Sequence, residues 1–337
     1  MNEIFSLKDT TVVVTGSTGF IGSHLVDKLL SLNHEVTVLD NFSTGRVDNL
    51  KHVKDKIKII DCDISVQDKW INEFKNTDWV FHVAGLADIV PSIQNPDGYF
   101  KSNVLGTLNI AEISKKNNIK RIIYLASASC YGIPDEYPTS EKEKIKPEYP
   151  YALTKLLGEQ IMLHWSKVYD LPVISLRLFN VYGTRSRTSG TYGAVFGVFL
   201  AQKLAKKPFT VVGDGNQTRD FTYVSDVIRA IISAVKSNKK GQIYNVGSGQ
   251  SVSVNKIVKL LGNEKITYIP KRPGEPDRSL ASINKIKKEL NWEPKITIEE
   301  GVQELIKNID YWKNAPVWNP DSIAEATKEW FKFLNKK

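Results

Sequence analysis

A glycine-rich turn near the start of the chain restricts the fold more than any other feature of the sequence. The apolar run 11–15 leads directly into Gly16-Ser-Thr-Gly19-Phe-Ile-Gly22, and apolar residues with helical spacing follow from 21 to 32. A strand, a glycine turn and a helix in this order are typical of a unit that binds the pyrophosphate of a dinucleotide. Gly16 permits the tight turn, Gly19 lets backbone N–H groups approach the phosphates, and Gly22 lets the helix pack closely on the strand. The spacing is GxxGxxG rather than GxGxxG, so an ordinary strand-to-helix turn is the alternative.

Short apolar runs alternate with helix-spaced segments through the first half of the chain. The predicted strands are 11–15, 35–39, 56–61, 79–83, 121–126 and 173–178, and the predicted helices are 21–32, 104–116 and 151–168. This alternation indicates parallel strands joined by helical crossovers. We therefore expect an α/β fold, a doubly wound parallel sheet of the Rossmann type with a smaller, interleaved C-terminal substrate lobe. The apolar run 242–246 could return to the sheet.

An acidic residue lies where the adenosine ribose of a bound dinucleotide is expected. Asp40 ends the second predicted strand, and a carboxylate roughly 20 residues beyond the glycine turn bonds the ribose 2′-hydroxyl of NAD. The same carboxylate repels the 2′-phosphate of NADP, so NAD is the expected cofactor. Arg46 keeps NADP open as the alternative. Asp63 and Ile64, after the third predicted strand, either flank the adenine or only cap the strand end.

Three polar residues form a candidate proton-transfer unit. Tyr151 and Lys155 stand four residues apart, on one face of a predicted helix, and Ser127 follows the fifth predicted strand. The carboxyl ends of strands in a doubly wound sheet open onto the ligand crevice. We expect the Lys155 cation to lower the pKa of Tyr151 so that the phenolate acts as a base, while Ser127 hydrogen-bonds the reacting hydroxyl. For Tyr151 and Lys155 alone, an incidental pair on an amphipathic helix is the alternative.

Composition and charge exclude several other classes. The formal net charge is +9, but the lysines and arginines are scattered, which favours a small anionic substrate and no nucleic acid. No window approaches the roughly 18 consecutive apolar residues of a membrane span, so no membrane association is expected. The first ten residues do not resemble a secretory signal. Cys62 and Cys130 form no CxxC pair, so we expect a cytoplasmic protein without a metal site.

Taken together, these residues resemble the extended short-chain dehydrogenase/reductase family. The resemblance rests on the turn 16–22, Asp40, Ser127, Tyr151 and Lys155, and on the segments 103–107, 177–183, 213–221 and 272–275. The combination is specific to the branch that acts on nucleotide sugars and is closest to the UDP-hexose 4-epimerases. The resemblance implies an NAD-binding domain over 1–180 with a returning segment near 215–248, and a nucleotide-sugar-binding lobe mainly over 181–337. It also implies a homodimer through two long helices near 98–118 and 151–169, whose outer faces would keep Leu156, Met162 and Trp165.

The resemblance assigns individual site residues as well. Catalysis would fall to Ser127, Tyr151 and Lys155. The cofactor would contact Tyr151 and Lys155. It would also contact Gly16, Gly19, Phe20, Ile21, Gly22, Asp40, Asn41, Ser43, Gly45, Asp63, Ile64, Ala84, Gly85, Leu86 and Asn103. A nucleoside-diphosphate sugar, with UDP the expected nucleotide, would contact Ser127, Ser129, Asn180, Val195, Arg219, Arg272, Glu275 and Ser279. Among these, Arg219, Arg272 and Asn180 correspond to diphosphate-binding residues of the family, and Glu275 to the acid on the nucleotide ribose.

The residues after Ser127 separate the reactions of this family. The 4,6-dehydratases carry an Asp-Glu pair there and the decarboxylases usually a Glu at the second position, whereas this chain has Ala128 and Ser129. Elimination of water needs such carboxylates as acid and base. Oxidation and re-reduction at one carbon need neither, so epimerisation at C4 through a transient 4-keto sugar is the expected reaction. A keto-sugar-nucleotide reductase, which consumes an external reductant, and a non-catalytic NAD-sensing protein are the alternatives.

One further residue bears on the size of the sugar. Ser279 corresponds to the position that borders the C2 substituent in the related 4-epimerases, where a Tyr closes the pocket and a small residue leaves room. The resemblance therefore predicts that N-acetylhexosamine nucleotides are accepted, together with plain hexoses. The alternative is that Ser279 only caps a helix predicted over 281–290.

Overall fold

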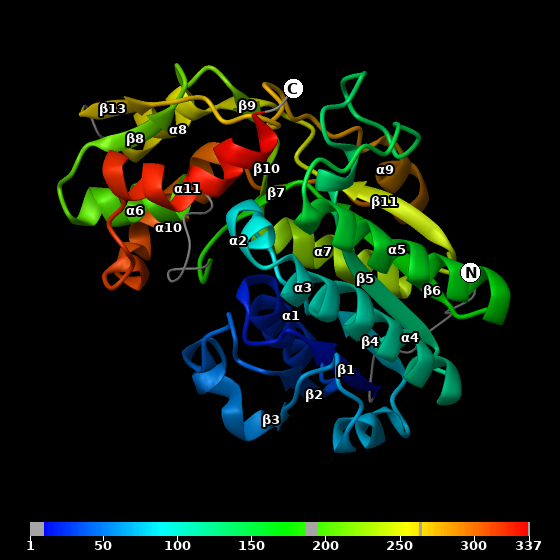
Figure 1. Cartoon of the computed structure of the whole chain (residues 1–337). Helices are drawn as coiled ribbons and strands as arrows, with labels where there is room; N and C mark the ends of the chain where they lie inside the picture. The colour runs from blue at the N-terminus through cyan, green and yellow to red at the C-terminus, as the bar shows by residue number, and fades with distance from the viewer. Residues whose placement is uncertain (1–9, 187–194, 263–264, 336–337) are drawn as a thin grey trace.

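A seven-stranded sheet forms the larger half of the molecule (Figure 1). The computed structural model describes residues 10–186, 195–262 and 265–335. The strand order is β11-β6-β5-β4-β1-β2-β3, and every neighbouring pair runs in parallel. The chain leaves β1 toward one edge and resumes at β4 on the other side, as in doubly wound folds. The predicted fold class is confirmed.

The strands of this sheet lie where continuous apolar runs occur in the sequence. They are β1 (Thr11–Thr15), β2 (Glu35–Asp40), β3 (Ile57–Asp61), β4 (Trp79–His82), β5 (Arg121–Ser127), β6 (Val173–Leu178) and β11 (Gln242–Val246). Parallel strands covered on both faces need apolar side chains at successive positions, which explains why most of these runs do not alternate. The edge strand β3 differs, because Lys58, Ile59 and Asp61 are exposed. β11 comes from the second half of the chain and pairs with β6. Gln242 lies opposite Ile174 at one end of the pairing, and Val246 lies opposite Leu178 at the other.

Helices cover both faces of the sheet. On one face α1 (Phe20–Ser31) packs against α7 (Val224–Lys236), and their apolar sides share a core with β1, β2 and β6. On the other face lie α4 (Gly106–Lys116) and α5 (Pro150–Tyr169). α3 (Pro96–Phe100) runs into α4 through η3 (Lys101–Leu105), a turn of π-helix. The shorter pieces η1 (Val47–Lys56), η2 (Lys69–Phe74), α2 (Ile89–Gln94) and η4 (Ala128–Tyr131) connect these elements. Among the described helices, none is long and apolar enough to cross a membrane.

A second apolar core lies beside the sheet, at the upper left of Figure 1. It is built from α6 (Val195–Leu204), β8 (Phe209–Val212), α8 (Val254–Leu261), β13 (Ile266–Ile269), α10 (Ile298–Lys307), η5 (Ile309–Trp312) and α11 (Pro320–Leu334). Three two-stranded ladders belong to this half: β8–β13, β7 (Asn180–Tyr182) with β10 (Phe221–Tyr223), and β9 (Thr218–Arg219) with β12 (Val252–Ser253). α9 (Asn284–Leu290) packs on β11, so the chain passes repeatedly between the two cores.

The prediction that Leu156 and Met162 face outward is wrong. Met162 is fully buried beneath the sheet, and Leu156 packs with the buried cluster around Tyr131. Trp165 is half-buried, and its indole Nε1 donates to Glu112 Oε1 at 2.7 Å. Helical periodicity had not distinguished the side of α5 that meets α4 and the sheet from the free side.

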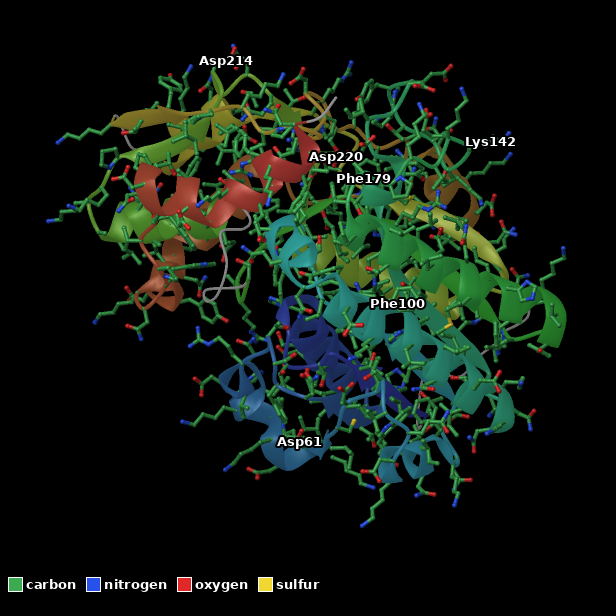
Figure 2. All side chains as sticks on the ribbon, in the orientation of Figure 1. Asp61, Phe100, Lys142, Phe179, Asp214 and Asp220 are labelled. Atoms are coloured by element: carbon green, nitrogen blue, oxygen red, sulfur yellow. The ribbon has the colours of Figure 1, made fainter. Side chains whose placement is uncertain are left out.

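Other apolar side chains do face outward on these helices. Phe100, labelled in Figure 2, is 51% exposed, Leu105 is 40% exposed and Leu153 is 44% exposed. They belong to α3, η3 and α5.

Candidate active site

A cavity of about 890 Å³ opens at the carboxyl ends of the parallel strands, between the two cores. Residues that follow β1, β2, β4 and β5 line one side, and residues from α6, β9 and the segment 272–279 line the other. Ligands of doubly wound folds bind at this edge, where the strand order reverses. With the single exception of Asn103, every residue predicted from the sequence to bind cofactor or substrate or to take part in catalysis lines this cavity.

The turn between β1 and α1 leaves no room for a side chain at Gly16 or Gly22. Gly16 has a φ of +66°, and a Cβ there would lie 2.6 Å from Ala84 Cα. A Cβ on Gly22 would lie 2.2 Å from the Gly16 carbonyl oxygen. The first turn of α1 carries no acidic residue, and no side chain caps its N-terminus. The unbonded N–H groups at that terminus can therefore receive a phosphate.

Asp40 connects the end of β2 to this turn. Its Oδ2 accepts from the Thr18 N–H at 2.8 Å and its Oδ1 from the Phe42 N–H at 2.9 Å. Arg46, on which the NADP alternative depended, does not line the cavity; its guanidinium lies 4.8 Å from the centre of the Tyr311 ring. This arrangement fits the adenosine ribose of NAD better than a 2′-phosphate.

The adenine-side residues Asp63 and Ile64 both line the cavity. Asp63 Oδ1 also accepts from the Ser65 N–H at 2.8 Å. Its carboxylate thus stabilises the turn after β3 while standing at the cavity wall, so the two roles considered for it are compatible.

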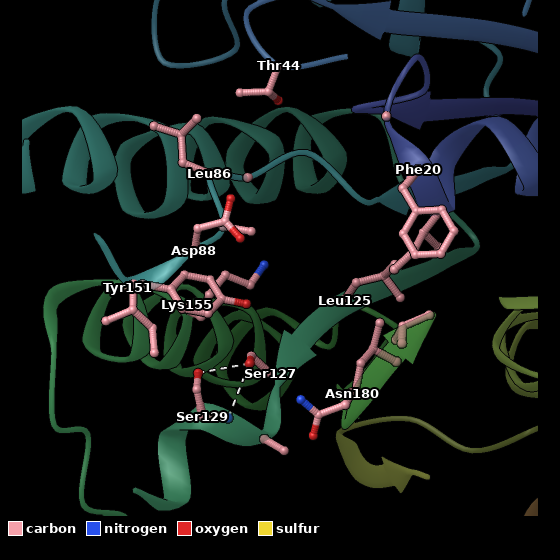
Figure 3. A pocket seen from close by; sticks show the side chains of 18 of the residues that line it. Phe20, Thr44, Leu86, Asp88, Leu125, Ser127, Ser129, Tyr151, Lys155 and Asn180 are labelled. Carbon is pink, nitrogen blue, oxygen red and sulfur yellow. Dashed lines mark hydrogen bonds between the residues drawn. The ribbon is translucent and has the colours of Figure 1, made fainter. Parts of the chain in front are cut away.

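Ser127, Tyr151 and Lys155 come together from two elements at the centre of the cavity (Figure 3). Ser127 is the last residue of β5, and its Oγ accepts from the Ser129 Oγ at 2.8 Å. Tyr151 and Lys155 lie one turn apart at the start of α5, where Pro150 is the first helical residue. The Tyr151 ring stacks on Tyr149, with ring centres 6.4 Å apart and planes 10° apart.

The pKa of Tyr151 is raised in this structure, and not lowered as the sequence analysis expected. Burial raises the pKa of Tyr151, the hydrogen bond to the Ser127 side chain opposes this rise, and the Asp88 charge adds to it. The loss of water around a phenolate outweighs the hydrogen bond from Ser127, which favours the charged form. Burial also lowers the pKa of Lys155 to about 8, and the Glu159 carboxylate opposes that change. The Lys155 Nζ lies 4.6 Å from the centre of the Tyr124 ring.

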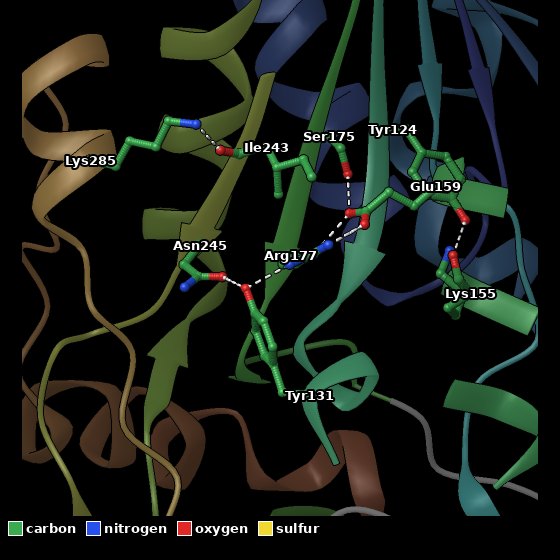
Figure 4. A network of polar contacts seen from close by, with 9 residues as sticks. All are labelled: Tyr124, Tyr131, Lys155, Glu159, Ser175, Arg177, Ile243, Asn245 and Lys285. Carbon is green, nitrogen blue, oxygen red and sulfur yellow. Dashed lines mark hydrogen bonds and ion pairs between the residues drawn. The ribbon is translucent and has the colours of Figure 1, made fainter. Parts of the chain in front are cut away.

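A buried polar network lies directly beneath these residues (Figure 4). Glu159, one turn after Lys155 on α5, pairs with Arg177 of β6 and accepts from the Ser175 hydroxyl at 2.7 Å. The Arg177 Nη1 donates to the Tyr131 hydroxyl at 2.9 Å, and that hydroxyl donates to Asn245 Oδ1 at 2.8 Å. The network thus joins α5, β6, η4 and β11 under the cavity. Sequence reasoning missed Glu159, although an acid one turn beyond Lys155 and an arginine inside an apolar strand were visible signals.

The loop between β4 and α2 is held by two side chains from the neighbouring helix segment. Asn103 Oδ1 accepts from the Leu86 N–H at 2.7 Å, and its Nδ2 donates to the Leu86 carbonyl at 3.0 Å. Asn103 therefore positions the loop and does not reach the cavity, contrary to its predicted role as a cofactor contact. The Tyr99 hydroxyl donates to the carbonyls of Ala87 and Asp88. Asp88, which the sequence analysis did not single out, lines the cavity beside Tyr151 (Figure 3).

Two arginines and one glutamate line the far end of the cavity. Glu275 accepts from the Arg219 Nη2 through Oε2 and from the Arg272 Nη1 through Oε1, each at 3.3 Å. The Arg219 Nη1 also donates to the Pro276 carbonyl at 2.9 Å. Two cations against one anion leave a positive charge, and guanidinium groups match phosphate oxygens in geometry. This end suits a diphosphate.

The helix α11 contributes a residue that the sequence analysis did not single out. Trp330 is 3% exposed, lines the cavity and donates from Nε1 to the Pro273 carbonyl at 2.8 Å. The Arg272 guanidinium carbon lies 5.3 Å from the centre of its ring. Trp330 thereby fixes both the backbone and the side chain of the segment that carries Arg272.

Ser279 also lines the cavity, and its N–H donates to the Thr218 carbonyl at 3.0 Å. The helix that it was expected to cap begins instead at Asn284, with Ile283 in the capping position. The capping role considered for Ser279 is therefore excluded, and its hydroxymethyl group is part of the cavity wall.

Comparison with known proteins agrees with this geometry. Residues 12–247 match the model of the NAD dependent epimerase/dehydratase family. The chain is 33% identical over 312 residues to the UDP-glucose 4-epimerase of Mycolicibacterium smegmatis, covering 90% of this chain and 98% of that protein.

Two solved structures resemble the whole fold. The UDP-N-acetylglucosamine 4-epimerase from Methanobrevibacter ruminantium M1 has a TM-score of 0.84 at 32% identity, covering 89% of this chain and 99% of that one. The UDP-glucuronic acid 4-epimerase from Bacillus cereus was solved with UDP-glucuronic acid and NAD. It has a TM-score of 0.83 at 29% identity, and the match covers 90% of this chain and 99% of that one.

Proposed function

This chain belongs to the NAD-dependent epimerase/dehydratase family, and on that basis we propose that it is an NAD-dependent UDP-hexose 4-epimerase. It would interconvert UDP-glucose and UDP-galactose, or their N-acetylated counterparts, through a transient 4-keto sugar. The observation that carries this proposal is the convergence of Ser127, Tyr151 and Lys155 on one cavity, with Ala128 and Ser129 where a dehydratase would need carboxylates.

NAD fits the half of the cavity next to the sheet. The glycine turn has no space for a side chain at Gly16 or Gly22, α1 presents free N–H groups, and Asp40 stands at the end of β2. The chemistry that NAD supplies when bound is reversible hydride transfer at the sugar carbon. The glycine turn and the N-terminus of α1 would hold its pyrophosphate, and Asp40 its adenosine ribose.

Tyr151 is the group that moves the proton. In its phenolate form, Tyr151 takes the proton of the C4 hydroxyl and returns it when the hydroxyl re-forms on the other face. Ser127 hydrogen-bonds the same hydroxyl and, through its bond to Tyr151, lowers the pKa that burial raises. Lys155, with a pKa of about 8, is largely protonated at pH 7 and keeps a positive charge beside the reacting oxygen.

Epimerisation requires the 4-keto sugar to turn over without leaving the site. The nucleotide must therefore be anchored at a point away from the sugar. Arg219 and Arg272 provide that anchor for the diphosphate, and Asn180 reaches the cavity from β7 (Figure 3). The sugar would lie between Tyr151 and Ser279, away from this anchor, so the ring can turn over while the diphosphate stays bound.

The test is incubation of the purified protein with a panel of nucleotide sugars and no added cofactor, with products identified by NMR. We expect UDP-glucose and UDP-N-acetylglucosamine to be converted to mixtures with their C4 epimers, with no net redox change. Conversion that proceeds only with stoichiometric NADH or NADPH would replace this proposal with the reductase alternative.

We also propose that the protein is a homodimer. The half-exposed Phe100, Leu105 and Leu153 lie on the helical segment from α3 to α4 and on α5, which pack against each other. Association of these helices across a two-fold axis would cover the three apolar side chains. A monomeric mass by light scattering at micromolar concentration would contradict this.

A further inference from the structure

Ser127 receives two hydrogen bonds from a single neighbour. Its Oγ accepts from the Ser129 Oγ at 2.8 Å and from the Ser129 backbone N–H at 3.2 Å, the second because Ser127 is the N-cap of η4. Figure 3 draws both bonds, with Tyr151 and Lys155 beside them. A serine hydroxyl has two acceptor sites and one hydrogen. Both acceptor sites of Ser127 are therefore filled, and the hydroxyl is left with one hydrogen to donate.

The ionised form of Tyr151 fixes the direction of these bonds. A phenolate has no hydrogen and can only accept, and the Ser127 side chain is hydrogen-bonded to the Tyr151 hydroxyl. When Tyr151 is ionised, Ser127 must therefore donate to it, and the Ser129 hydroxyl must in turn donate to Ser127. The two serines then form a chain of donors that points at the base, and each bond in such a chain strengthens the next.

The short helix that carries Ser129 is fixed from below. Tyr131, two residues after Ser129, is 1% exposed, and its hydroxyl accepts from Arg177 and donates to Asn245 in the buried network. Because the Tyr131 side chain ties η4 to β6 and β11, Ser129 is held against Ser127 before any substrate binds. A donor that is fixed in advance costs no reorganisation at the moment of reaction.

From this arrangement we infer that Ser129 is a positioning residue for the proposed 4-epimerisation, on which the inference rests. It keeps Ser127 a donor throughout the reaction. Before the C4 proton is transferred, Ser127 donates to the Tyr151 phenolate. Once Tyr151 has taken that proton, Ser127 donates to the oxygen of the 4-keto sugar. The C4 proton thus passes directly to Tyr151, and the proton of Ser127 stays on Ser127.

The Ser129 hydroxyl can be removed without changing any charge near the base. The titratable side chains around Tyr151 come from the elements packed against it and are Asp88, Tyr99, Tyr124, Cys130, Tyr149 and Lys155. Ser129→Ala keeps all of them and also keeps the backbone N–H that Ser127 caps. A change in the proton affinity of Tyr151 in this variant is therefore due to the lost hydroxyl.

The experiment measures kcat and KM with NAD present, over the pH range in which the protein stays folded. The substrate is UDP-glucose or UDP-N-acetylglucosamine, whichever the wild type converts faster. Ser129→Ala and Ser129→Thr are compared with the wild type, and Ser127→Ala is compared with the double variant that also carries Ser129→Ala. Ser31→Ala is the matched control, because this exposed serine donates only within its own helix, to the Lys28 carbonyl at 2.7 Å. Circular dichroism and thermal unfolding check the fold of each variant.

We expect Ser129→Ala to lower kcat at neutral pH about three- to tenfold, the effect of one hydrogen bond, with KM nearly unchanged. Removing a donor that favours the phenolate raises the pKa of Tyr151, so the acid limb of the kcat profile should move to higher pH. Ser129→Thr keeps the hydroxyl and should restore both quantities. In the Ser127→Ala background, the loss of Ser129 should change kcat by less than about twofold, because the residue through which it acts is gone.

Three results would overturn the inference and leave the epimerase proposal intact. A raised KM with an unchanged kcat profile would make Ser129 only a substrate contact. An equal loss in Ser129→Thr and Ser129→Ala, with both folded as the wild type, would show that the hydroxyl is not the cause. A full further loss in the Ser127→Ala background would show that Ser129 acts independently of Ser127.

A measurement without turnover keeps the two proposals distinct. If no nucleotide sugar is epimerised, the proposed function fails. The inference is then judged from the ionisation of Tyr151 with NAD present, followed by ultraviolet difference spectra between each protein and its Tyr151→Phe counterpart. Tyr151 should ionise at a higher pH in Ser129→Ala than in the wild type and Ser129→Thr, and ionisation at the same pH in all three would overturn the inference.

Discussion

Arg177 and Glu159 form a two-pronged ion pair inside the protein. The Arg177 Nη2 lies 2.6 Å from Glu159 Oε1, and the Arg177 Nε lies 3.1 Å and 3.0 Å from the two carboxylate oxygens. The side chains are 5% and 2% exposed. The pair joins the helix that carries Tyr151 and Lys155 to the sheet, so its integrity bears on both stability and the site.

Removing one partner of this pair should destabilise the protein strongly. Glu159→Gln leaves the Arg177 charge buried without a counter-ion, which we expect to lower the free energy of unfolding by about 3–5 kcal/mol, measured by urea denaturation. The double variant Glu159→Leu with Arg177→Met removes both charges and should be more stable than Glu159→Gln. A double variant as unstable as the single one would show that the charge is not the cause.

Replacing the phenolic hydroxyl should stop the reaction and spare the cofactor. Tyr151→Phe removes only the proton acceptor, so we expect kcat to fall by at least about 100-fold while the NAD content of the purified protein, read by absorbance after denaturation, stays near that of the wild type. Substantial residual epimerisation would exclude Tyr151 as the base.

Enlarging residue 279 should select against N-acetylated sugars. Ser279→Tyr adds a ring at the cavity wall, which we expect to reduce kcat/KM for UDP-N-acetylglucosamine by at least about tenfold more than for UDP-glucose, because only the former carries the extra group. Initial rates with the two substrates measure this. An equal loss on both sugars would contradict a role in C2 recognition.

The stability of the protein should fall in mild acid through His82. Burial lowers the pKa of this histidine to about 3, and its ring nitrogens contact the hydroxyls of Thr15 at 2.8 Å and Thr107 at 2.9 Å. The unfolded chain binds a proton at His82 below about pH 6.5 that the folded protein does not bind, so stability declines as the pH falls from 6.5 toward 3.

Between pH 7 and pH 5 this contribution amounts to roughly 2 kcal/mol. Between these two pH values, the free energy of unfolding of His82→Gln should therefore fall by about 2 kcal/mol less than that of the wild type. Urea unfolding at both pH values measures this. The same acid dependence in the variant and the wild type would show that other groups are responsible.

Shortening Trp330 should weaken substrate binding more than it slows the chemistry. Trp330→Ala removes the ring beside Arg272 and the bond to the Pro273 carbonyl, so we expect KM for the nucleotide sugar to rise about tenfold with kcat nearly unchanged. Phe333→Ala, at a 50% exposed position of the same helix, is the control. A loss confined to kcat would contradict a positioning role.

The sequence was informative where the signal is local. Most strands of the sheet were predictable because both of their faces are buried, so that their apolar runs are continuous. The predicted ends of all seven runs lie within a residue of those of β1 to β6 and β11. Tyr151 and Lys155 were recognisable because helical spacing alone sets them on one face.

The parts that could not be predicted depend on contacts between distant segments. Asn103 was predicted from the sequence to contact the cofactor, but its side-chain amide hydrogen-bonds the backbone of Leu86 in the loop after β4. Asp88 and Trp330 stand in segments without a motif, and only the packing of α2 against α11 and of α11 against residues 273–274 brings them to the site (Figure 1). The direction of the Tyr151 pKa change depends on how far burial removes water, which spacing does not reveal.

The return of β11 to the edge of the sheet has a consequence for how the protein is made. While the chain emerges from the ribosome, β6 is complete at Leu178, yet its partner begins only at Gln242. Until then the nascent sheet has an open edge of unpaired N–H and carbonyl groups and lacks α7 over one face, a state prone to pair with other chains. A gene fragment that stops near residue 180 would encode the same unfinished sheet, so dividing the chain there would not yield an independently folding cofactor domain.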